Sequence, residues 1–406
     1  TVLGLWKDNL VVIGSGDPSV GDPVLARMAK ESITAAFVQW AKRLKAAGVT
    51  TIQGELLVDD FIFDQEYVHP SWRQQQKNLQ KWYTAPVGGL NFNDNCIDVV
   101  IKPAKVLSQP AIVSLIPDIP WVQLDNSSKT TTKGEPIVVR RGTGPIQISV
   151  SGPVSKPNTA QNPLSVTVTD PGLFFANTCR HVLKQEGITI NGAIRRQRVQ
   201  MPGGILPRDF KVIATYERRL DDVIRRMNKR SQNMFAEAAL KTLGAYVVRD
   251  NLPGVGSFAG GRAAVLEFLK SISVLSEGVV IDDGSGLSHS NRVTPKMITT
   301  ILGYMDRHSR RSIWWSSLAE AGDQEGSMRR RLKDLKGKVF AKTGHINGVS
   351  ALSGYVLGPA DRRYAFSVIC NQTYKVKGGI STADRLQDKI CRVLATWEPV
   401  LSSSGG

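Results

Sequence analysis

The sequence predicts an α+β protein, in which a mostly β region comes first and a domain of helices and an antiparallel sheet follows. Apolar and polar residues alternate in short runs such as 97–101 and 164–168, which is typical of strands with one exposed face. In the second half, apolar residues recur at helical spacing before a group of strand patterns. We expect the β region, with two small subdomains, over residues 1–195 and the mixed domain over 196–400. Residues 401–406 are expected to form a disordered tail.

A long helix is expected near the start of the chain. It follows a strand over residues 5–13 and runs from about Val24 to Ala47. Four apolar residues lie on one face at helical spacing: Ile33, Phe37, Trp40 and Leu44. Gly48 is expected to end the helix, and its apolar face is expected to pack against a core.

Short strands fill the rest of the first half. Pro and Gly residues separate the alternating runs, so we expect small antiparallel sheets. A short helix follows these strands, with Asp170 as its N-cap and Pro171 as its first residue.

Helices dominate the next part of the chain. Their patterns cover about 217–229, 233–243, 262–274 and 294–306. Three strands then follow in quick succession, at 338–342, 350–357 and 363–370. The turn at 358–363 joins the last two strands, which predicts an antiparallel hairpin. An amphipathic helix over about 382–396 closes the domain.

The composition excludes several classes of protein. Of the 406 residues, 41% are apolar, which is enough for a large core. No run approaches the ~18 uninterrupted apolar residues of a membrane span. The net charge is +17, yet the basic residues are scattered and lack interleaved aromatic residues, so no nucleic-acid partner is expected. A general attraction to anionic polymers fits the same charge.

Neither a metal nor a cofactor is expected. The four cysteines form no Cys-x-x-Cys pair, and the five histidines show no metal-ligand spacing. Whether Cys370 and Cys391 form a disulfide is left open. A bridge is conceivable because the last strand and the last helix are neighbours in the chain.

Two short motifs point to chemistry. Ser231-Gln232-Asn233 stands at the start of a helical pattern, and Lys342-Thr343-Gly344 stands at the end of a strand pattern. Alone, each is weak, because Ser-x-Asn arises by chance, a serine there can be a simple helix cap, and Lys-Thr-Gly is a common strand ending. Together, in this order and beside these elements, they match two motifs of serine β-lactamases and penicillin-binding proteins.

The surroundings of both motifs carry a more specific resemblance. They comprise Asn228–Glu237 and Asp283–Ser288, and in the first half Asp8–Pro18, Val58–Asp60 and Tyr83–Pro86. On these segments the chain resembles the D-alanyl-D-alanine carboxypeptidases of the penicillin-binding protein 4 type, the low-molecular-mass class C penicillin-binding proteins. The resemblance runs from about residue 5 to residue 395. It implies a β-lactamase/transpeptidase-like sandwich, with an antiparallel sheet flanked by helices, for the penicillin-binding domain. The region 1–195 would then be a large, mostly β insert.

One departure from this family is serious. The family's nucleophile lies in a Ser-x-x-Lys segment, and no lysine of this chain has a serine three places before it. We expect that segment upstream of residue 1, with a signal peptide before it. Two smaller departures are Gln232, where the family more often has Asp or Asn, and His345, where it often has Ser or Thr.

The resemblance implies acyl transfer through a covalent serine ester, in which a D-Ala-D-Ala bond is cleaved. The implied catalytic residues are Ser231, Asn233 and Lys342, and the implied substrate-binding residues are Thr343, Gly344 and His345. Ser231 would relay a proton to the leaving amine, and Asn233 would hold the peptide amide. Ser231 Oγ and Lys342 Nζ are therefore expected to face one cleft.

The remaining implied roles concern the terminal carboxylate of the substrate and the carbonyl group that is attacked. Lys342 and Thr343 would bind the terminal carboxylate of the substrate by charge and by a hydrogen bond. Gly344 would let the strand approach the substrate closely. The backbone N–H of His345 would form half of the oxyanion hole.

The resemblance also implies partners and a location. Expected partners are peptidoglycan stem peptides and β-lactam antibiotics, in the bacterial periplasm or elsewhere in the extracytoplasmic cell envelope, with no transmembrane segment. Two alternatives stay open. One is a catalytically dead wall-binding homologue, because Ser-x-x-Lys is absent from this chain. The other is a β-lactamase or esterase on the same fold, against which the long β insert argues. The balance of carboxypeptidase and endopeptidase action also stays open.

Overall fold

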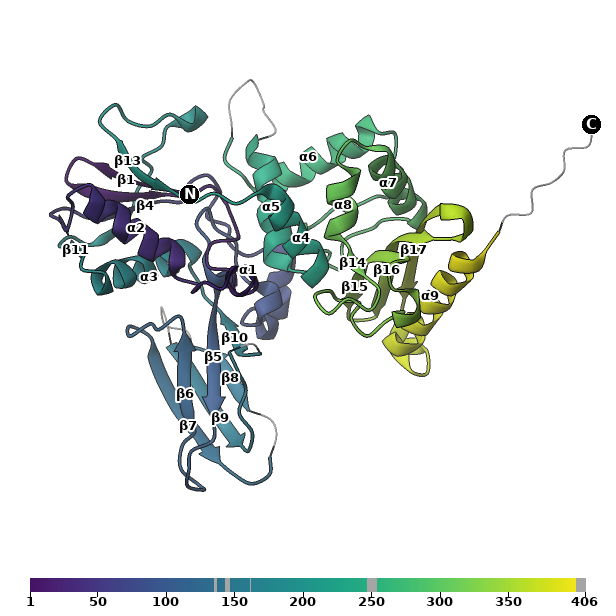
Figure 1. The fold of residues 1–406 in the computed structure, drawn as a ribbon, viewed down its shortest axis with the longest axis horizontal. Helices are drawn as coiled ribbons and strands as arrows, with labels where there is room; N and C mark the ends of the chain where they lie inside the picture. Colours follow the sequence, from purple (N-terminus) through teal and green to yellow (C-terminus); the bar gives the residue numbers. More distant parts are fainter. Residues whose placement is uncertain (135–136, 143–146, 161, 247–253, 399–406) are drawn as a thin grey trace, which may run out of the picture. The chain divides into compact units, whose positions relative to one another are not determined.

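The computed structural model describes residues 1–134, 137–142, 147–160, 162–246 and 254–398. They form two compact units (Figure 1). The first unit holds residues 1–218 and 233–264, and the second holds residues 219–232 and the chain from 265 onward. The expected division of the chain into a β region over 1–195 and a mixed domain over 196–400 stays a prediction. The predicted tail, 401–406, lies outside the described residues.

The first unit is built on a five-stranded sheet of order β12-β4-β2-β1-β13. Its strands are β1 (Val2–Trp6), β2 (Asn9–Ile13), β4 (Leu56–Asp59), β12 (Ile194–Arg196) and β13 (Lys211–Thr215). β1 pairs antiparallel with β2 and β13, whereas β4 pairs parallel with β2 and β12. The expectation of purely antiparallel sheets is wrong here, because helices between the parallel strands return the chain to the same end of the sheet.

Two helices replace the single long helix predicted over 24–47. α1 (Pro23–Ala29) ends at Lys30, whose φ of 57° is left-handed, and α2 (Ala35–Ala46) begins five residues later. Ile33, which was expected on the same face, lies in the turn between the two helices and is partly buried against the core, so the apolar spacing ran across the break. The predicted apolar face of α2 is buried in the main core: Phe37, Trp40 and Leu44. Gly48, with a φ of 77°, follows the end of α2 as expected.

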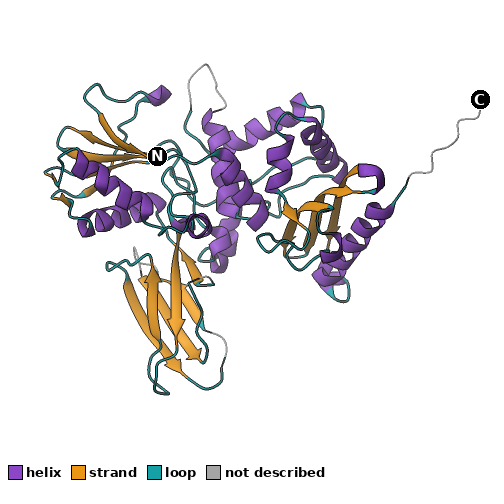
Figure 2. Cartoon of the chain, in the orientation of Figure 1, coloured by secondary structure: helices purple, strands orange, loops and turns teal. Residues whose placement is uncertain are grey.

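Smaller sheets complete the first unit (Figure 2). One is antiparallel and consists of β10 (Leu164–Thr167), β5 (Cys96–Lys102) and β6 (Ile112–Ile116). The other consists of β7 (Gln123–Thr130), β9 (Gln147–Val154) and β8 (Val138–Arg141), with β7 and β9 parallel. A short parallel pair joins β3 (Thr51–Ile52) to β11 (Thr189–Ile190).

One strand of these sheets differs from its prediction. β5 is buried on both faces up to Lys102, although its alternation predicted one exposed face. Asp98, which alternates with the apolar residues of the run 97–101, is buried and accepts a hydrogen bond from Ser165. A polar residue can alternate with apolar ones inside a core when a neighbour satisfies it. The predicted start of α3 (Pro171–Gln185) is confirmed, since the Asp170 side chain accepts the N–H of Leu173 at 2.9 Å.

A buried lysine anchors α5 (Asn233–Tyr246) within the first unit. Lys241 Nζ lies 2.6 Å from Asp64 Oδ1 and donates to the backbone oxygen of Glu66 at 2.8 Å. The side chain of Lys241 is fully buried, and the ring of Phe258 lies 4.5 Å from its Nζ. The pair ties α5, which begins with Asn233, to the loop after β4. α6 (Phe258–Ser271) then leads from the first unit into the second.

The second unit contains an antiparallel sheet of order β14-β15-β16-β17. Its strands are β14 (Ala319–Glu320), β15 (Val339–Ile346), β16 (Val349–Leu357) and β17 (Arg363–Asn371). Its other helices are α4 (Leu220–Arg230), α7 (Pro295–Arg307), α8 (Arg311–Ser317) and α9 (Gly379–Thr396). The predicted hairpin is confirmed, because β16 and β17 pair antiparallel. α8 and β14 were not predicted, since both are too short to leave a clear pattern.

Side chains of β15 alternate between two cores. Ala341 packs in a cluster with Cys391 of α9, whereas Phe340 packs in a cluster with Trp315 of α8 and Leu302 of α7. The sheet therefore lies between α9 on one face and α7 and α8 on the other (Figure 2). This arrangement is the predicted sandwich, and the α+β class is confirmed. Within the described ranges, no helix is long and apolar enough to cross a bilayer.

Candidate active site

Ser231 and Lys342 meet in the second unit, although 111 positions separate them in the chain. Lys342 Nζ donates to Ser231 Oγ at 2.6 Å and to the backbone oxygen of Thr343 at 2.7 Å. α4 ends directly before Ser231, and Lys342 lies in the middle of β15. The two motifs predicted this proximity, and the structure places the two side chains in direct contact.

Ser231 closes a helix and does not begin one. It is the C-cap of α4, with φ 55° and ψ 50°, and its N–H bonds to the backbone oxygen of Met227. This left-handed conformation is unfavourable for a non-glycine residue by about 1–2 kcal/mol. Contacts of α4 hold it in place: Asn228 Nδ2 donates to Ser317 Oγ at 2.8 Å, and Lys229 Nζ lies 2.9 Å from Asp323. Backbone strain fixed in this way is characteristic of functional sites.

Lys342 carries its charge in an apolar setting. Burial lowers the pKa of Lys342 to about 8. Across the described part of the chain, no carboxylate lies within ion-pair distance of its Nζ. A lysine with a pKa this close to neutral pH is mostly charged and can attract an anion, yet it can also exchange a proton with Ser231. Among the described residues, the Lys342 ammonium thus has hydrogen-bond acceptors but no carboxylate as a counter-charge.

This environment gives a direct prediction for the titration of Lys342. We expect the Lys342 ammonium to lose its proton near pH 8, whereas an ordinary lysine has a pKa of about 10.4. The measurement is NMR of lysine side-chain Cε resonances against pH, with Lys342→Arg to identify the signal. Lys338→Arg is the matched control and should leave that signal in place. A midpoint above about 10 for the Lys342 signal would contradict the burial argument.

Asn233 belongs to the first unit, where it begins α5. Its Nδ2 donates to the backbone oxygen of Tyr83 at 2.8 Å. Tyr83 lies in the short 3₁₀ turn Trp82–Thr84, within the segment that carried part of the resemblance. Of the predicted catalytic residues, the second unit thus holds Ser231 and Lys342, and the first unit holds Asn233.

The rest of the Lys-Thr-Gly motif lies along one edge of the sheet. Thr343 is buried and its Oγ1 donates to Ser327 Oγ at 2.7 Å. β14 pairs only with Phe340 and Ala341 of β15, so among the described strands none pairs with residues 342–346 on that edge. An open edge of this kind can accept an extended peptide by main-chain hydrogen bonds.

Gly344 is not required by the packing of the chain itself. A Cβ at this position would approach only Ala351 Cβ, at 3.6 Å, which is an ordinary contact. The expected role of Gly344, to let the strand approach the substrate closely, therefore stays a prediction.

His345 is held by a network that the motifs did not predict. Its Nε2 lies 3.0 Å from Asp384 Oδ1, and the same oxygen accepts from Ser350 Oγ at 2.8 Å. Arg331 Nη1 lies 3.6 Å from this oxygen. Burial alone would raise the pKa of Asp384, but the hydrogen bonds from His345 and Ser350 and the charge of Arg331 outweigh it and lower the pKa. The network ties α9 to the end of β15.

We expect Asp384→Asn to destabilise the protein by about 2 kcal/mol at neutral pH, because hydrogen bonds to a charged group are lost. The folded pKa of Asp384 is lowered, so its contribution is present above the unfolded value of 3.8 and disappears as the pH falls through the folded value. Urea unfolding of both proteins at pH 7 and at pH 3 measures the difference. A gap between them that is equally large at pH 3 would contradict the ionic origin.

The segment Asp283–Ser288, which carried part of the resemblance, forms a turn closed by its own hydrogen bonds. Asp283 Oδ1 accepts the N–H of Gly286 at 2.8 Å, and its Oδ2 accepts the N–H of Ser288 at 2.6 Å, which makes Asp283–Ser288 a closed turn. The four cysteines are free thiols, so the open question of a Cys370–Cys391 bridge is answered. Within the described ranges, no three His, Cys, Asp or Glu residues are arranged to hold a metal ion.

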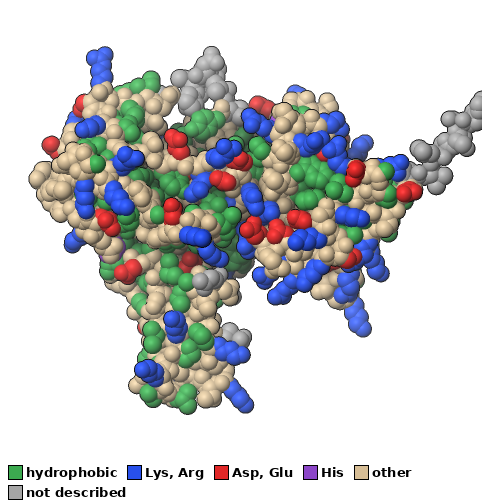
Figure 3. Space-filling model, viewed as in Figure 1, with side chains coloured by type: hydrophobic (Ala, Val, Ile, Leu, Met, Phe, Trp, Pro, Cys, Tyr) green, Lys and Arg blue, Asp and Glu red, His purple; other side chains and the backbone are tan. Residues whose placement is uncertain are grey.

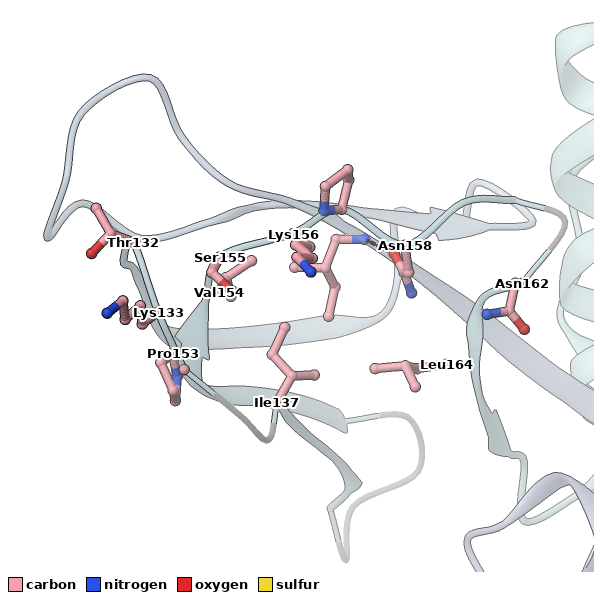
Figure 4. A pocket seen from close by; sticks show the side chains of 13 residues that line it. Thr132, Lys133, Ile137, Pro153, Val154, Ser155, Lys156, Asn158, Asn162 and Leu164 are labelled. Carbon is pink, nitrogen blue, oxygen red and sulfur yellow. Dashed lines mark hydrogen bonds between the residues drawn. The ribbon is translucent and has the colours of Figure 1, made fainter.

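A hollow of about 790 Å³ lies in the β7-β9-β8 region of the first unit (Figure 4). Lys133, Lys156, Asn158 and Leu164 are among the residues that line it. The amide of Asn158 is used internally, since its Oδ1 accepts from the N–H of Ile101 and its Nδ2 donates to Val99 O. None of the described residues that line the hollow is a His, Cys, Asp or Glu.

Comparison with known sequences agrees with the motif-based resemblance. The sequence model of the D-Ala-D-Ala carboxypeptidase 3 (S13) family matches residues 4–390. A D-alanyl-D-alanine carboxypeptidase from Actinomadura sp. (strain R39) is 30% identical over 383 residues, which cover 89% of this chain and 65% of that protein. The D-alanyl-D-alanine carboxypeptidase DacB of Haemophilus influenzae is 24% identical over 401 residues, covering 94% of this chain and 74% of that protein. The chain thus spans about two thirds of the length of the Actinomadura relative.

Comparison with solved structures concerns the fold. Penicillin binding protein 4 (dacB) from Haemophilus influenzae matches with a TM-score of 0.76 at 21% identity, over 98% of this chain and 86% of that one. Its complex with a novel β-lactam matches with a TM-score of 0.70 at 20% identity, over 98% and 85%. At this level of identity the likeness establishes a shared fold across both units.

Proposed function

Because the chain belongs to the D-Ala-D-Ala carboxypeptidase 3 (S13) family, we propose that it provides the binding and proton-transfer part of a serine-type D-Ala-D-Ala carboxypeptidase. The substrates are peptidoglycan stem peptides, and β-lactams acylate the same site. The observation that supports this proposal most directly is the hydrogen bond of 2.6 Å from Lys342 Nζ to Ser231 Oγ. The lysine that makes it has a pKa lowered to about 8.

Lys342 and Thr343 bind the terminal carboxylate of the substrate. Lys342 supplies a positive charge that no described side chain neutralises. A substrate carboxylate would fill that role and would favour the charged form of the lysine. Thr343 Oγ1 now donates to Ser327 Oγ and can turn its hydrogen to the carboxylate instead.

Ser231 passes the proton to the leaving amine. Since Lys342 donates to Ser231 Oγ, the hydroxyl hydrogen of Ser231 is directed toward another acceptor. When Ser231 gives up this proton, Lys342 replaces it, so the pair moves one proton without a free hydroxide or alkoxide. A lysine pKa close to the working pH suits this exchange. Asn233 Nδ2 and Oδ1 are proposed to hold the amide of the peptide, in place of the present bond to Tyr83.

The acyl bond itself needs a nucleophile that residues 1–406 do not contain. No Ser-x-x-Lys occurs in the chain, and the family's covalent chemistry depends on that serine. We propose that a Ser-x-x-Lys segment outside these residues supplies it. The backbone N–H of His345 would then stabilise the oxyanion of the tetrahedral intermediate. Action on stem peptides places the enzyme on the extracytoplasmic side, in the cell envelope.

The experiment is D-alanine release from a stem pentapeptide that ends in D-Ala-D-Ala, by a form of the protein that carries the Ser-x-x-Lys segment. We expect one D-alanine per peptide, inhibition by penicillin, and no release from the same peptide ending in L-Ala-L-Ala. Release from a cross-linked dimer measures endopeptidase action in parallel. Binding of stem peptides without any release would support the catalytically dead homologue, which the absence of Ser-x-x-Lys favours. Fast hydrolysis of penicillin without peptide cleavage would support a β-lactamase.

A further inference from the structure

The last helix of the second unit, α9, has small or polar side chains on its buried face and large apolar side chains on an exposed face. The face of α9 toward the sheet has small or polar buried residues, namely Ala383, Gln387, Cys391 and Ala395. Large apolar residues stand on another side, namely Leu386, Ile390 and Val393, with Trp397 directly after the helix. Spacings of four and three residues put Leu386, Ile390 and Val393 along one line of the helix, and Trp397 follows at its C-cap. We call these four side chains the outer stripe.

The outer stripe is open to solvent. Leu386 is 50% exposed, Val393 is 61% exposed and Trp397 is 47% exposed, and Ile390 is half-buried between them. Tyr364 of β17 holds the end of the stripe, because its hydroxyl donates to the backbone oxygen of Trp397 at 3.0 Å. Contiguous exposed apolar side chains on a folded unit mark an interaction surface more often than single ones do.

Basic side chains accompany the outer stripe. The exposed ones on α9 and in the segment before it are Lys375, Lys377, Arg385, Lys389 and Arg392. Arg392 is paired with Asp334, whose Oδ2 lies 2.9 Å from its Nε. The two aspartates of α9 share Arg331, whose Nη2 lies 2.7 Å from Asp388 Oδ1 and whose Nη1 lies 3.6 Å from Asp384 Oδ1. The four other basic side chains outnumber the single negative charge that this arrangement leaves among the described residues of the flank. Figure 3 shows Lys and Arg side chains around the part of the second unit where Figure 1 places α9.

We propose that the outer stripe and its basic flank bind an anionic lipid surface. Large apolar residues on one line of a helix, with Lys and Arg beside them, are typical of helices that lie in the membrane interface. Aromatic residues such as Trp397, and Tyr374 just before the helix, suit the headgroup region. A lipid surface supplies negative charge and an apolar layer together, and it requires no groove in the protein.

A second copy of the chain fits this surface less well. Pairing two outer stripes would bring Arg385 and Lys389 of both copies together, in a chain whose net charge is already +17. Like charges at that distance repel and oppose association. The inference is independent of the proposed peptidase activity, because α9 uses its opposite face to cover the sheet.

The experiment is cosedimentation of the purified chain with vesicles of phosphatidylcholine, alone or mixed with phosphatidylglycerol. We expect binding to the mixed vesicles that weakens as salt rises, because surface charges are screened, and little binding to pure phosphatidylcholine. The double variant Leu386→Ser, Val393→Ser should bind at least about tenfold more weakly, since burial of even one such side chain is worth about that factor. Arg385→Ser with Lys389→Ser should weaken binding and flatten its salt dependence.

The matched control is Leu275→Ser with Val280→Ser, which changes two exposed apolar residues of the same unit away from α9. It should bind the mixed vesicles as the unchanged chain does. Thermal unfolding confirms that each variant is folded, as expected for exposed positions. Equal binding by the Leu386, Val393 variant and the unchanged chain would overturn the proposal, and so would absence of binding. Dimerisation that this variant abolishes, without vesicle binding, would assign the stripe to a second copy instead.

Discussion

Replacing Lys342 by alanine is expected to slow acylation by penicillin by about 10²–10³-fold in a form of the protein that carries Ser-x-x-Lys. Two functions are lost at once. The substrate carboxylate loses the cation that no described side chain neutralises, and Ser231 loses the group that donates to its Oγ at 2.6 Å. The second-order rate of covalent labelling by a fluorescent penicillin measures the effect.

Two further variants separate the functions of Lys342. Lys342→Arg keeps the positive charge but cannot release a proton near neutral pH. We expect it to restore binding of the carboxylate more than the rate of acylation. Lys338→Ala, an exposed lysine just before β15, is the matched control and should label normally. A folded Lys342→Ala protein that labels at the unchanged rate would remove Lys342 from the site.

Removing the partner of the buried lysine is expected to have the largest effect on stability. Asp64→Ala removes the carboxylate in contact with the fully buried Lys241 ammonium and leaves only the weaker attraction of Glu66 and Glu237. Removal of one partner of a buried ion pair is destabilising by about 3–5 kcal/mol. Urea unfolding at pH 7 measures the loss. Asp125→Ala, an exposed aspartate on β7 of the same unit, is the control and should change little.

The pH dependence of this loss has a definite sign. Burial outweighs the hydrogen bond and charge of Asp64 and lowers the pKa of Lys241 in the folded protein. Without Asp64 that pKa falls further, so the unfolded chain binds more protons than the folded one over a wider range of pH. The stability of the variant should therefore rise with pH toward 10.5, and its deficit should shrink. A loss below about 1 kcal/mol, or one that does not change with pH, would show that the pair is not ionic in the folded state.

The sequence was informative wherever a periodic pattern or a short motif carried the signal. The apolar residues Phe37, Trp40 and Leu44 predicted the buried face of α2, and the turn at 358–363 predicted the β16–β17 hairpin. The proximity of Ser231 and Lys342 followed from two motifs whose order and neighbouring elements matched a known arrangement. Local patterns of this kind are predictive because they determine which face of a helix or strand is buried.

Contacts between distant residues without a motif could not be predicted. Asp384 lies 39 positions from His345 and carries no pattern that distinguishes it from other surface aspartates, yet it organises the network at the end of β15. Lys241 and Asp64 likewise meet across 177 positions, and only the folded chain shows that the lysine is buried. The break after Lys30 was missed because Ile33 keeps the helical spacing to Phe37 although it lies in the turn before α2.

Covalent labelling of two forms of the protein tests the central claim most directly. One form is residues 1–406, and the other carries a Ser-x-x-Lys segment as well. Both are incubated with fluorescent penicillin and separated on a denaturing gel, after circular dichroism has shown that each is folded. The account predicts no label on residues 1–406, because Ser231 relays protons and forms no acyl bond, and stoichiometric label on the longer form. A labelled 1–406 chain whose label disappears in Ser231→Ala would contradict the account, since the nucleophile would then be Ser231 itself.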